Sequence, residues 1–442
     1  MAIALLKKIN EVIPYWMKKP FSKTIRNKLI KNKEFLNTYS ELTVYDLMSE
    51  EEKNKLQFEL LKQTLIHAYD HTKYYHELFD KLEIKIEDVN SVADLKRIPI
   101  LTKDILKERW DDLQSDDIDD FYLVTTGGTS GEPIKVNMEK NAIYREWAFV
   151  YHYWSKFGYD FKTTKLATFR GINLGNKIYE INPLYAEVRL NVFALNENNF
   201  GQYIEIIDRF GADIIYGYPS AIYNFCRIAN KKGINLKERF KMVLLISENL
   251  YAFQEEMIKQ VINCEIAMFY GHSERAVFGE KYGKTYLFNS LYGITEIGKK
   301  NEPIVTGFIN RKTPLIRYLI DDQVIPTDTG YEVVGHHSSE VLVGSNDERV
   351  TMASINFHDD TFKKIKAYQF VQKDIGRCIL RLESEKKLSS VDMYNIKNNV
   401  ERKLGKGFIC IPEQVDAVEI SKRGKYKMLI SEINILENEG RN

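Results

Sequence analysis

The residues best suited to bind phosphate lie between positions 125 and 135, where the sequence is TTGGTSGEPIK. Its glycines permit backbone angles that side chains forbid, so successive N–H groups can curl into a nest for an anion. The expected phosphate contacts are Thr125, Thr126, Gly127, Gly128, Thr129, Ser130, Gly131 and Lys135. No Gly-Lys-Ser/Thr follows, so this is not the P-loop. A flexible surface turn is the alternative, which the Pro-x-Lys ending and the strand expected just before the loop disfavour.

A second group of candidate residues lies in the sequence MFYGHSE at 268–274. The aromatic residues Phe269 and Tyr270 end an apolar run, and a flat ring followed by glycine can stack on a planar base. Glu274 adds a carboxylate, and Mg²⁺ is commonly bound by carboxylates together with phosphate oxygens. A plain strand-to-loop turn with a surface acid is the alternative.

Alternating strands and helices are predicted to hold these segments in place. Short apolar or β-branched runs predict strands at 121–125, 165–169, 213–216, 242–246 and 266–270. Helical stretches are expected between them, at 139–156, 199–210, 219–232 and 251–262. This alternation indicates a largely parallel sheet, and ligands of such sheets bind at the carboxyl ends of the strands.

The remaining sequence predicts helices before this sheet and a small domain after it. Residues 1–80 are mainly helical in pattern, including Glu51–Asp70, and Thr102 is placed to cap a later helix. The polar stretch Gly335–Asn346 suits a linker. Beyond it we expect strands at 364–371, 378–382 and 414–420 and a helix at 389–404. The fold class is therefore α/β, with a large N-terminal domain (1–334) of parallel-rich sheets and helices, plus a small C-terminal α+β domain (335–442).

These motifs together resemble the adenylate-forming superfamily, which includes acyl- and aryl-CoA ligases and luciferase. The resemblance is greatest to the phenylacetate–CoA ligase-like branch with its CapK-type capsular-polysaccharide members, and it extends over much of the chain. Ile98–Asp104 resembles the segment ahead of that branch's phosphate loop, and Tyr216–Ser220 resembles its mid-domain turn. The resemblance implies that the first domain binds ATP and an acyl substrate and that the second is a mobile lid.

The resemblance also assigns nucleotide contacts. By similarity to a Tyr-Gly-x-Ser/Thr-Glu motif, the residues around the adenine and the metal would be Tyr270, Gly271, Ser273 and Glu274. The sequence PLIRYLIDD at 314–322 resembles a motif whose last aspartate accepts both ribose hydroxyls, and an ionised carboxylate suits that role because it only accepts hydrogen bonds. This selects Asp322, with Arg317 supporting the phosphate or that carboxylate. An edge strand with surface acids is the alternative.

Two further segments need separate interpretations. The sequence LISEN at 245–249 corresponds to a Gly-Glu turn that lines the adenine in the family, so Ser247 and Glu248 are expected contacts, with serine in place of the glycine. A second Tyr-Gly-x-Thr-Glu match, Tyr292–Glu296, lies in a β-rich stretch and is interpreted as structural.

The lid is expected to carry a catalytic lysine. The sequence SKRGKYK at 421–427 resembles the family's Ser-Gly-Lys motif and selects Lys425, whose ammonium would stabilise charge on the acyl-phosphate oxygens. A solvated basic face is the alternative. The family's Gly-Arg-x-x-Asp hinge is replaced by Gly335-His336-His337-Ser338-Ser339, which lacks both charged residues. This departure bears on the second half-reaction, although Glu340 could substitute for the acid.

Composition and charge limit the kinds of molecule that the protein is expected to bind. The formal net charge of +1 gives no global field for nucleic acid. The four cysteines, Cys226, Cys264, Cys378 and Cys410, have no metal-ligand spacing and fit a reducing, cytoplasmic setting. Residues 1–33 contain nine Lys or Arg and a single acid, Glu11. We favour a solvated basic face for this segment, with peripheral contact to an anionic membrane as the alternative.

The expected activity is ATP- and Mg²⁺-dependent activation of a carboxylic acid as its acyl-adenylate, followed by transfer to a thiol or amine. The acceptor would be coenzyme A, or a carrier or sugar amine in capsule or surface-polysaccharide biosynthesis. The alternatives are an acyl- or aryl-CoA ligase of primary metabolism and a catalytically impaired nucleotide-binding homologue. The acyl pocket is expected near 145–154, 216–220 and 269–272, where an aromatic lining would suit an aryl or apolar acid.

Overall fold

The computed structural model describes residues 19–125, 134–170, 172, 174–336, 341–345, 349–352, 360–362, 364–420 and 426–433. The helices are α3 (Ser22–Ile30), α4 (Lys33–Tyr45), α5 (Glu50–His71), α6 (Lys73–Lys81), α7 (Lys103–Glu108), α8 (Ala142–Ser155), α9 (Phe200–Phe210), α10 (Pro219–Lys231), α11 (Ala252–Ile262) and α12 (Ser390–Leu404). The strands of the first domain are β1 (Phe121–Thr125), β2 (Lys135–Glu139), β3 (Leu166–Arg170), β4 (Tyr179–Asn182), β5 (Glu187–Asn191), β6 (Ile214–Gly217), β7 (Met242–Leu245), β8 (Glu265–Gly271), β9 (Phe278–Tyr282), β10 (Thr285–Phe288), β11 (Gly293–Ile297), β12 (Pro303–Gly307), β13 (Tyr318–Leu319), β14 (Asp322–Thr327) and β15 (Gly330–His336). The strands after them are β16 (Val341–Val343), β17 (Arg349–Thr351), β18 (Ile365–Asp374), β19 (Arg377–Ser384), β20 (Ile409–Val415) and β21 (Leu429–Ser431).

A ten-stranded mixed sheet forms the centre of the first domain, in the order β14-β15-β10-β9-β8-β7-β6-β3-β5-β4. Strands β5, β3, β6, β7 and β8 are parallel neighbours. From β8 onward the pairing is antiparallel through β9, β10, β15 and β14. The parallel sheet predicted from the sequence is therefore present, and it continues into an antiparallel half that carries the end of the first domain.

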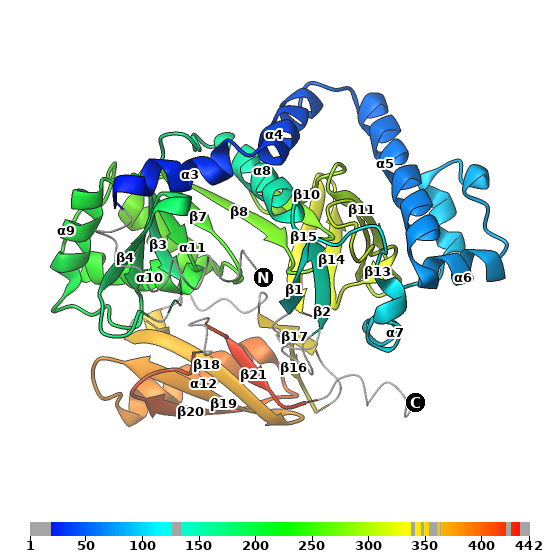
Figure 1. The fold of residues 1–442 in the computed structure, drawn as a ribbon. Coiled ribbons are helices and arrows are strands. Elements are labelled where there is room, and N and C mark those ends of the chain that lie inside the picture. The colour runs from blue at the N-terminus through cyan, green and yellow to red at the C-terminus, as the bar shows by residue number, and fades with distance from the viewer. Residues whose placement is uncertain are drawn as a thin grey trace.

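Side chains of the parallel strands alternate between two hydrophobic layers, because successive residues of a strand point to opposite faces. In β7, Met242 and Leu244 belong to the core that contains α8, whereas Val243 and Leu245 belong to the core that contains α9, α10 and α11. Figure 1 shows α3 and α4 on the same side as α8. The parallel half is thus a strand layer between two helical layers.

The strands and helices predicted between residues 139 and 270 are found within a few residues of their expected bounds. The first predicted strand, 121–125, has the expected bounds but another place in the fold: β1 pairs only with β2, as an antiparallel ribbon. The prediction that it belongs to the parallel sheet was wrong. Antiparallel strands can be joined by a short connection, whereas parallel strands need a crossover of a dozen or more residues, and only nine residues lie between Thr125 and Lys135.

The C-terminal domain is a four-stranded sheet, in the order β20-β19-β18-β21, packed against α12. The third of these strands along the chain, β20, lies at Ile409–Val415 rather than at the predicted 414–420. Pro412 lies inside β20, and proline is tolerated there because β20 is an edge strand of the sheet. Figure 1 shows this domain below the carboxyl-terminal side of the large sheet.

The N-terminal helices divide between two parts of the first domain: α3 and α4 lie along the large sheet, whereas α5 and α6 lie beside the strands β11 and β13 (Figure 1). The capping box of Ser49 and Glu52 begins α5, and Thr102 caps α7 as expected by accepting a hydrogen bond from the Ile105 amide. Arg26, one of the basic residues in the 1–33 segment, is buried and donates to the carbonyls of Leu184 and Phe161 at 2.8 Å each. Over the described part of the chain, no helix is both long and apolar enough to cross a membrane.

Candidate functional site

The loops that follow the parallel strands converge at one edge of the sheet, because the carboxyl ends of parallel strands lie together. Strands β6, β7 and β8 end at Gly217, Leu245 and Gly271. Gly217 lies so close to the backbone of Phe169 in β3 that a side chain at this position would collide with the Phe169 carbonyl. This close approach brings the turn that begins at Tyr218 against the end of β3, where the Tyr218 amide donates to the same carbonyl at 2.9 Å.

A buried carboxylate lies beside the end of β8. Asp322, at the start of β14, is 5% exposed. It accepts a hydrogen bond of 2.6 Å from the hydroxyl of Tyr270. The ring nitrogen Nε2 of His272 lies 2.5 Å from that hydroxyl and 3.1 Å from Asp322 Oδ2. The structure therefore brings together two segments of the sequence that were expected to hold one nucleotide.

Burial and the neighbouring Asp322 carboxylate together shift the pKa values of His272 and Tyr270. Burial lowers the pKa of His272, but the contact with the Asp322 carboxylate more than offsets this, so the pKa of His272 is raised overall. Burial raises the pKa of Tyr270 well above its usual value, and the adjacent Asp322 raises it further. Tyr270 consequently stays a neutral hydrogen-bond donor, and the raised pKa of His272 favours its positively charged form beside Asp322.

Glu274 lies on the same side of the site and is 8% exposed. The hydroxyl of Tyr318, in β13, donates to Glu274 Oε1 at 3.3 Å. Burial and the neighbouring carboxylate raise the pKa of Tyr318, so its hydroxyl also remains a donor. One oxygen of Glu274 is thus oriented by the protein, and the arrangement suits a carboxylate that meets a metal-bound phosphate.

The segment 98–104 packs against the strand that precedes Asp322. Leu101 forms a parallel bridge with Tyr318, through the Leu101 amide to the Arg317 carbonyl at 2.9 Å and the Leu319 amide to the Leu101 carbonyl at 3.0 Å. Lys103, the first residue of α7, forms an ion pair with Asp321. The two neighbouring aspartates therefore have different partners. Asp321 pairs with Lys103, whereas Asp322 contacts Tyr270 and His272.

Arg317 has a different environment from the one its motif suggested. Its guanidinium forms two hydrogen bonds with Glu296, of 2.9 and 3.1 Å, and also donates to the Ile98 carbonyl. Glu296 belongs to the second Tyr-Gly-x-Thr-Glu match, which was interpreted as structural, and its place in β11 agrees with that interpretation. Arg317 therefore connects β11 to the segment around Ile98. None of these hydrogen bonds joins it to Asp322.

The turn after β7 holds the expected residues Ser247 and Glu248. Ser247 has φ of 64°, a left-handed backbone that favours glycine, which is the residue the family uses there. Glu248 accepts the Ser220 amide at 3.0 Å through one oxygen and the Tyr426 amide at 2.9 Å through the other. Tyr426 belongs to the C-terminal domain, so Glu248 links α10 of the first domain to the lid.

Other contacts strengthen this interface between the domains. The ring of Phe253 lies 5.6 Å from that of Tyr368, centroid to centroid, and Tyr251 is part of the lid's hydrophobic core. At its edge, Glu385 of the lid pairs with Lys231 at 2.5 Å and with Arg227 at 3.3 Å, both on α10. The lid is therefore docked in this structure by hydrogen bonds, aromatic packing and ion pairs.

The predicted phosphate loop is only partly described. Its ends, Thr125 and Lys135, are paired in register across β1 and β2, and both side chains are exposed. The residues Thr126, Gly127, Gly128, Thr129, Ser130 and Gly131 lie outside the described residues, as does Lys425, which directly precedes Tyr426. The β1–β2 ribbon thus fixes the base of the loop.

The remaining expected contacts differ in exposure. Phe269 is half-buried and its ring stacks on that of Phe278, with centroids 5.1 Å apart. Gly271 and Ser273 are exposed at the end of β8. Sequence reasoning did not single out His272 or Lys103, although both lie within motifs that it quoted. Both are titratable residues inside motifs already recognised in the sequence, and that combination could have identified them as candidates.

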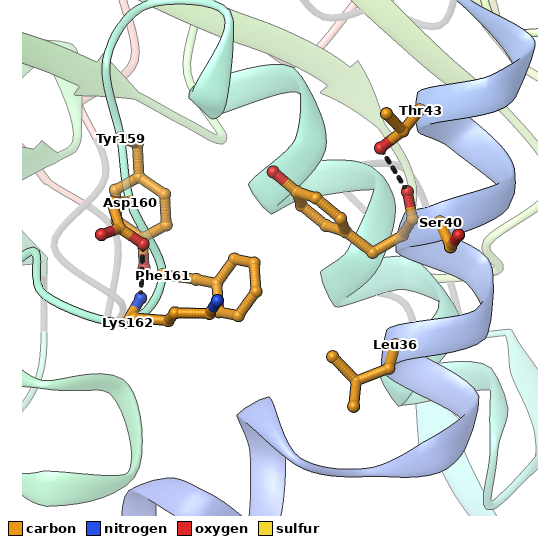
Figure 2. Close-up of a pocket in the computed structure, with 8 residues that line it drawn as sticks. Leu36, Ser40, Thr43, Tyr159, Asp160, Phe161 and Lys162 are labelled. Carbon is orange, nitrogen blue, oxygen red and sulfur yellow. Dashed lines mark hydrogen bonds between the residues drawn. The ribbon is translucent and has the colours of Figure 1, made fainter.

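A separate surface pocket lies between α4 and the loop after α8 (Figure 2). It is lined by Leu36, Tyr39, Ser40, Thr43, Tyr159, Asp160, Phe161 and Lys162. Asp160 accepts hydrogen bonds of 2.8 Å from the Lys162 amide and 2.7 Å from the Thr163 hydroxyl. These contacts use the only acidic side chain of the pocket for the local turn, so we do not place the nucleotide there.

Comparison with known proteins agrees with this architecture. Residues 342–432 match the family described as the CapK C-terminal domain. Protein CapK of Staphylococcus aureus is 24% identical over 380 residues, which cover 78% of this chain and 81% of CapK. This chain is thus similar to CapK over most of its length, and its C-terminal part matches the CapK C-terminal domain family. Phenylacetate–coenzyme A ligase of Escherichia coli (strain K12) is 29% identical over 108 residues, covering 24% of this chain and 25% of the ligase.

Solved structures share the fold over most of the chain. A 2-hydroxyisobutyryl-CoA ligase in the postadenylation state, in complex with 2-HIB-AMP, superposes with a TM-score of 0.66 at 14% identity, covering 89% of this chain and 92% of the ligase. The same ligase in the thioesterification state, with 2-HIB-AMP and CoA, gives a TM-score of 0.50 with the same coverage. The fold is that of an adenylate-forming CoA ligase with a large N-terminal and a small C-terminal domain.

Proposed function

We propose that this protein is an AMP-forming ligase that activates a carboxylic acid as its acyl-adenylate. The observation that carries the proposal is the buried Asp322, which lies hydrogen-bonded to Tyr270 beside the end of β8, with Glu274 three residues beyond Gly271. A carboxylate held in this way can accept the hydroxyls of a ribose. The nucleotide's phosphates would then extend past Glu274 toward the loop carried by β1 and β2.

In the proposed reaction, a carboxylate oxygen of the substrate attacks the α-phosphorus of ATP. A new carboxylate-to-phosphorus bond forms, the bond from the α-phosphorus to the bridging oxygen breaks, and pyrophosphate leaves with the electron pair. Backbone amides and hydroxyls of residues 125–131, together with Lys135, would bind the phosphates. Lys425 would stabilise the charge that develops on the transferring group, an effect worth several kcal/mol at a water-excluded site.

The donor set at Glu274 fits Mg²⁺. Mg²⁺ is usually bound by one or two carboxylates together with substrate phosphates and waters. Glu274 offers one carboxylate, and the hydrogen bond from the neutral Tyr318 hydroxyl orients this carboxylate without removing its charge. When bound, the ion would supply positive charge against the phosphates. Tyr318 and the surrounding strands hold the carboxylate in place.

We assign the observed lid position to the adenylation half of the reaction. Its support is the higher TM-score against the postadenylation state than against the thioesterification state of the same ligase. The bond from the Tyr426 amide to Glu248 would hold the adjacent Lys425 at the site in this state. Release of that bond would free the lid to turn for the second half-reaction.

For the second half-reaction we propose transfer to a thiol or amine. Relatedness to CapK favours a carrier or sugar amine in capsule or surface-polysaccharide biosynthesis, whereas relatedness to CoA ligases favours coenzyme A. We place the reaction in the cytoplasm, and a membrane contact of residues 1–33 would bring the product to a surface-polysaccharide pathway. Formation of an acyl thioester when CoA is added, against transfer to an amine, separates the two acceptors.

The test of the adenylation step is ATP–pyrophosphate exchange with a panel of carboxylic acids. We expect exchange that depends on one class of acid and is lost in the Asp322→Asn variant. Aryl and apolar acids are expected first, since Tyr216, Trp154 and Trp147 lie in one aromatic cluster beside the strand ends. ATP binding without exchange for any acid would indicate an impaired nucleotide-binding homologue, and absence of both would refute the proposal.

A further inference from the structure

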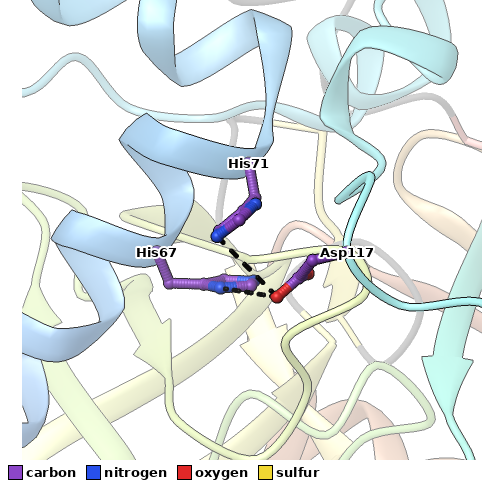
Figure 3. Close-up of side chains that lie close together, drawn as sticks. All are labelled: His67, His71 and Asp117. Atoms are coloured by element: carbon purple, nitrogen blue, oxygen red, sulfur yellow. Dashed lines mark ion pairs between the residues drawn. The ribbon is translucent and has the colours of Figure 1, made fainter.

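Two histidines and an aspartate lie close together (Figure 3), and the aspartate is four residues before Phe121, where the β1–β2 ribbon begins. His67 and His71 are four residues apart on α5, so their side chains share one face of the helix. Asp117 comes from the segment just before β1. Its Oδ2 lies 3.7 Å from His67 Nδ1 and 3.8 Å from His71 Nε2. The three ligand atoms all lie within 4.8 Å of one another.

Each of these side chains is oriented by a second partner. His71 Nδ1 lies 2.9 Å from Asp116 Oδ1, and His67 Nε2 lies 3.0 Å from the Arg311 carbonyl. The Ser115 hydroxyl donates to the other oxygen of Asp117. Histidines that bind metals almost always donate their other ring N–H to a carboxylate or a carbonyl, which fixes the tautomer. Both histidines show this arrangement, and the other ring nitrogen of each lies near Asp117 Oδ2.

A cationic group already lies at this position. Arg311 Nη2 lies 2.9 Å from His67 Nδ1, where it can donate to the ring's lone pair. The arginine residue is exposed, and its backbone is held separately, by the Arg311 amide to Glu139 at 2.9 Å and by the carbonyl to His67. The guanidinium can therefore swing into solvent without disturbing the loop that carries it.

We propose that His67 Nδ1, His71 Nε2 and Asp117 Oδ2 form a binding site for a divalent transition metal, with Zn²⁺ as the best match. Two imidazoles and one carboxylate are the donor types that Zn²⁺ takes, and three protein ligands leave the fourth position for water. Mg²⁺ is a poor match because it prefers an all-oxygen shell. The metal displaces the Arg311 side chain, which fills the site in its absence.

Such a site joins α5 to the base of the ribbon that carries the phosphate loop. Asp117 lies four residues before β1, and Arg311 contacts Glu139 at the end of β2. The bound metal therefore cross-links a helix to the ribbon's base. It is separate from the Mg²⁺ expected at Glu274, and it stands whether or not the chain adenylates an acid.

The test is a titration of untagged, chelator-stripped protein with Co²⁺ and then Zn²⁺, followed by calorimetry and by the visible absorption of bound Co²⁺. We expect one tight site per chain, an absorption typical of tetrahedral Co²⁺ with nitrogen ligands, and displacement of Co²⁺ by Zn²⁺. Changing a single ligand, by His67→Gln, His71→Gln or Asp117→Asn, should weaken binding at least tenfold. Arg311→Gln should tighten it, because the competing cation is gone.

The matched control is His76→Gln, which removes an exposed histidine that stacks on Tyr69 outside the site. This variant should bind Co²⁺ as the unaltered protein does. Thermal unfolding in the presence of chelator checks that each variant is folded, and Zn²⁺ should raise the midpoint only where all three ligands are intact. Binding that survives in the His67→Gln/His71→Gln double variant, or an Arg311→Gln variant that binds no tighter, would overturn the proposal.

Discussion

Replacing Glu248 by glutamine should separate the two proposed half-reactions. The carboxylate accepts one backbone amide from each domain, Ser220 at 3.0 Å and Tyr426 at 2.9 Å. Whichever way the new amide group turns, its NH2 faces one backbone N–H, and the other N–H loses a charged acceptor. The variant therefore weakens the docking of the lid residue next to Lys425 while it keeps the size of the side chain.

The expected size of the effect follows from the bond that crosses the interface. A hydrogen bond to a charged acceptor contributes about 1.5–3 kcal/mol. Glu248 is half-buried, so water replaces part of this, and we take the lower end of the range. About 1.4 kcal/mol corresponds to a tenfold change in an equilibrium constant. The docked lid should become roughly tenfold less favourable.

The assay compares the two halves directly. ATP–pyrophosphate exchange should fall about tenfold in Glu248→Gln, whereas transfer from a supplied acyl-adenylate should be unchanged or faster. Glu255→Gln is the matched control, because the ion pair of Glu255 is formed within α11, with Lys259. An equal loss in both halves, or no loss in exchange, would refute the assignment of Glu248 as the link that holds the adenylating lid.

Three other predictions concern the nucleotide site and the lid. Asp322→Asn should raise the dissociation constant of ATP about tenfold or more, since hydroxyl donors lose a charged acceptor; calorimetry checks this, and unchanged affinity with a native fold would exclude the ribose role. Ser389→Ala removes the hydroxyl that caps α12 and should lower the free energy of unfolding by about 1 kcal/mol in chemical denaturation; a change below about 0.3 kcal/mol would show that the cap contributes little. The hydrogen bond from Lys231 lowers the pKa of Glu385, so its stabilising contribution is present above the ordinary glutamate pKa and is lost as the pH falls through the lowered value. Thermal unfolding of Glu385→Gln should therefore differ from that of the unaltered protein at neutral pH and converge with it in acid, and a difference that persists in acid would point to another cause.

Periodic elements were predictable because their signal is local. The alternation of Met242 to Leu245 between two cores and the helical spacing in 251–262 depend only on which face each side chain takes. The strand at Ile409–Val415 was predicted too late in the chain, at 414–420, because it lies at a sheet edge and contains a proline. Its presence is decided by pairing with β19, which no local pattern reports.

Motifs in the sequence selected Asp322 and Glu274 as candidate residues, and both are buried near the end of β8; their roles in binding stay predictions. The sequence could not predict contacts between residues that are distant in the chain. Glu248 and Tyr426 are 178 residues apart, and nothing in LISEN indicates a contact with the lid. Arg317 was expected to support the phosphate or Asp322, and the structure shows its guanidinium paired with Glu296. Arg317 directly precedes β13, and β13 and β11, which contains Glu296, both flank β12 in a three-stranded sheet.

For the rotation of the second domain proposed above, the register of the last two strands of the large sheet puts the point of attachment beside Asp322. Asp322 and His336 are directly opposite each other on β14 and β15, and His336 is the last residue of β15 before the chain leaves for the second domain. A body that turns about its point of attachment moves least near that point. The far edge of the second domain would then move a long way, while the ribose of a bound nucleotide would hardly move. The same contact between Asp322 and the ribose could therefore be kept in both positions of the second domain.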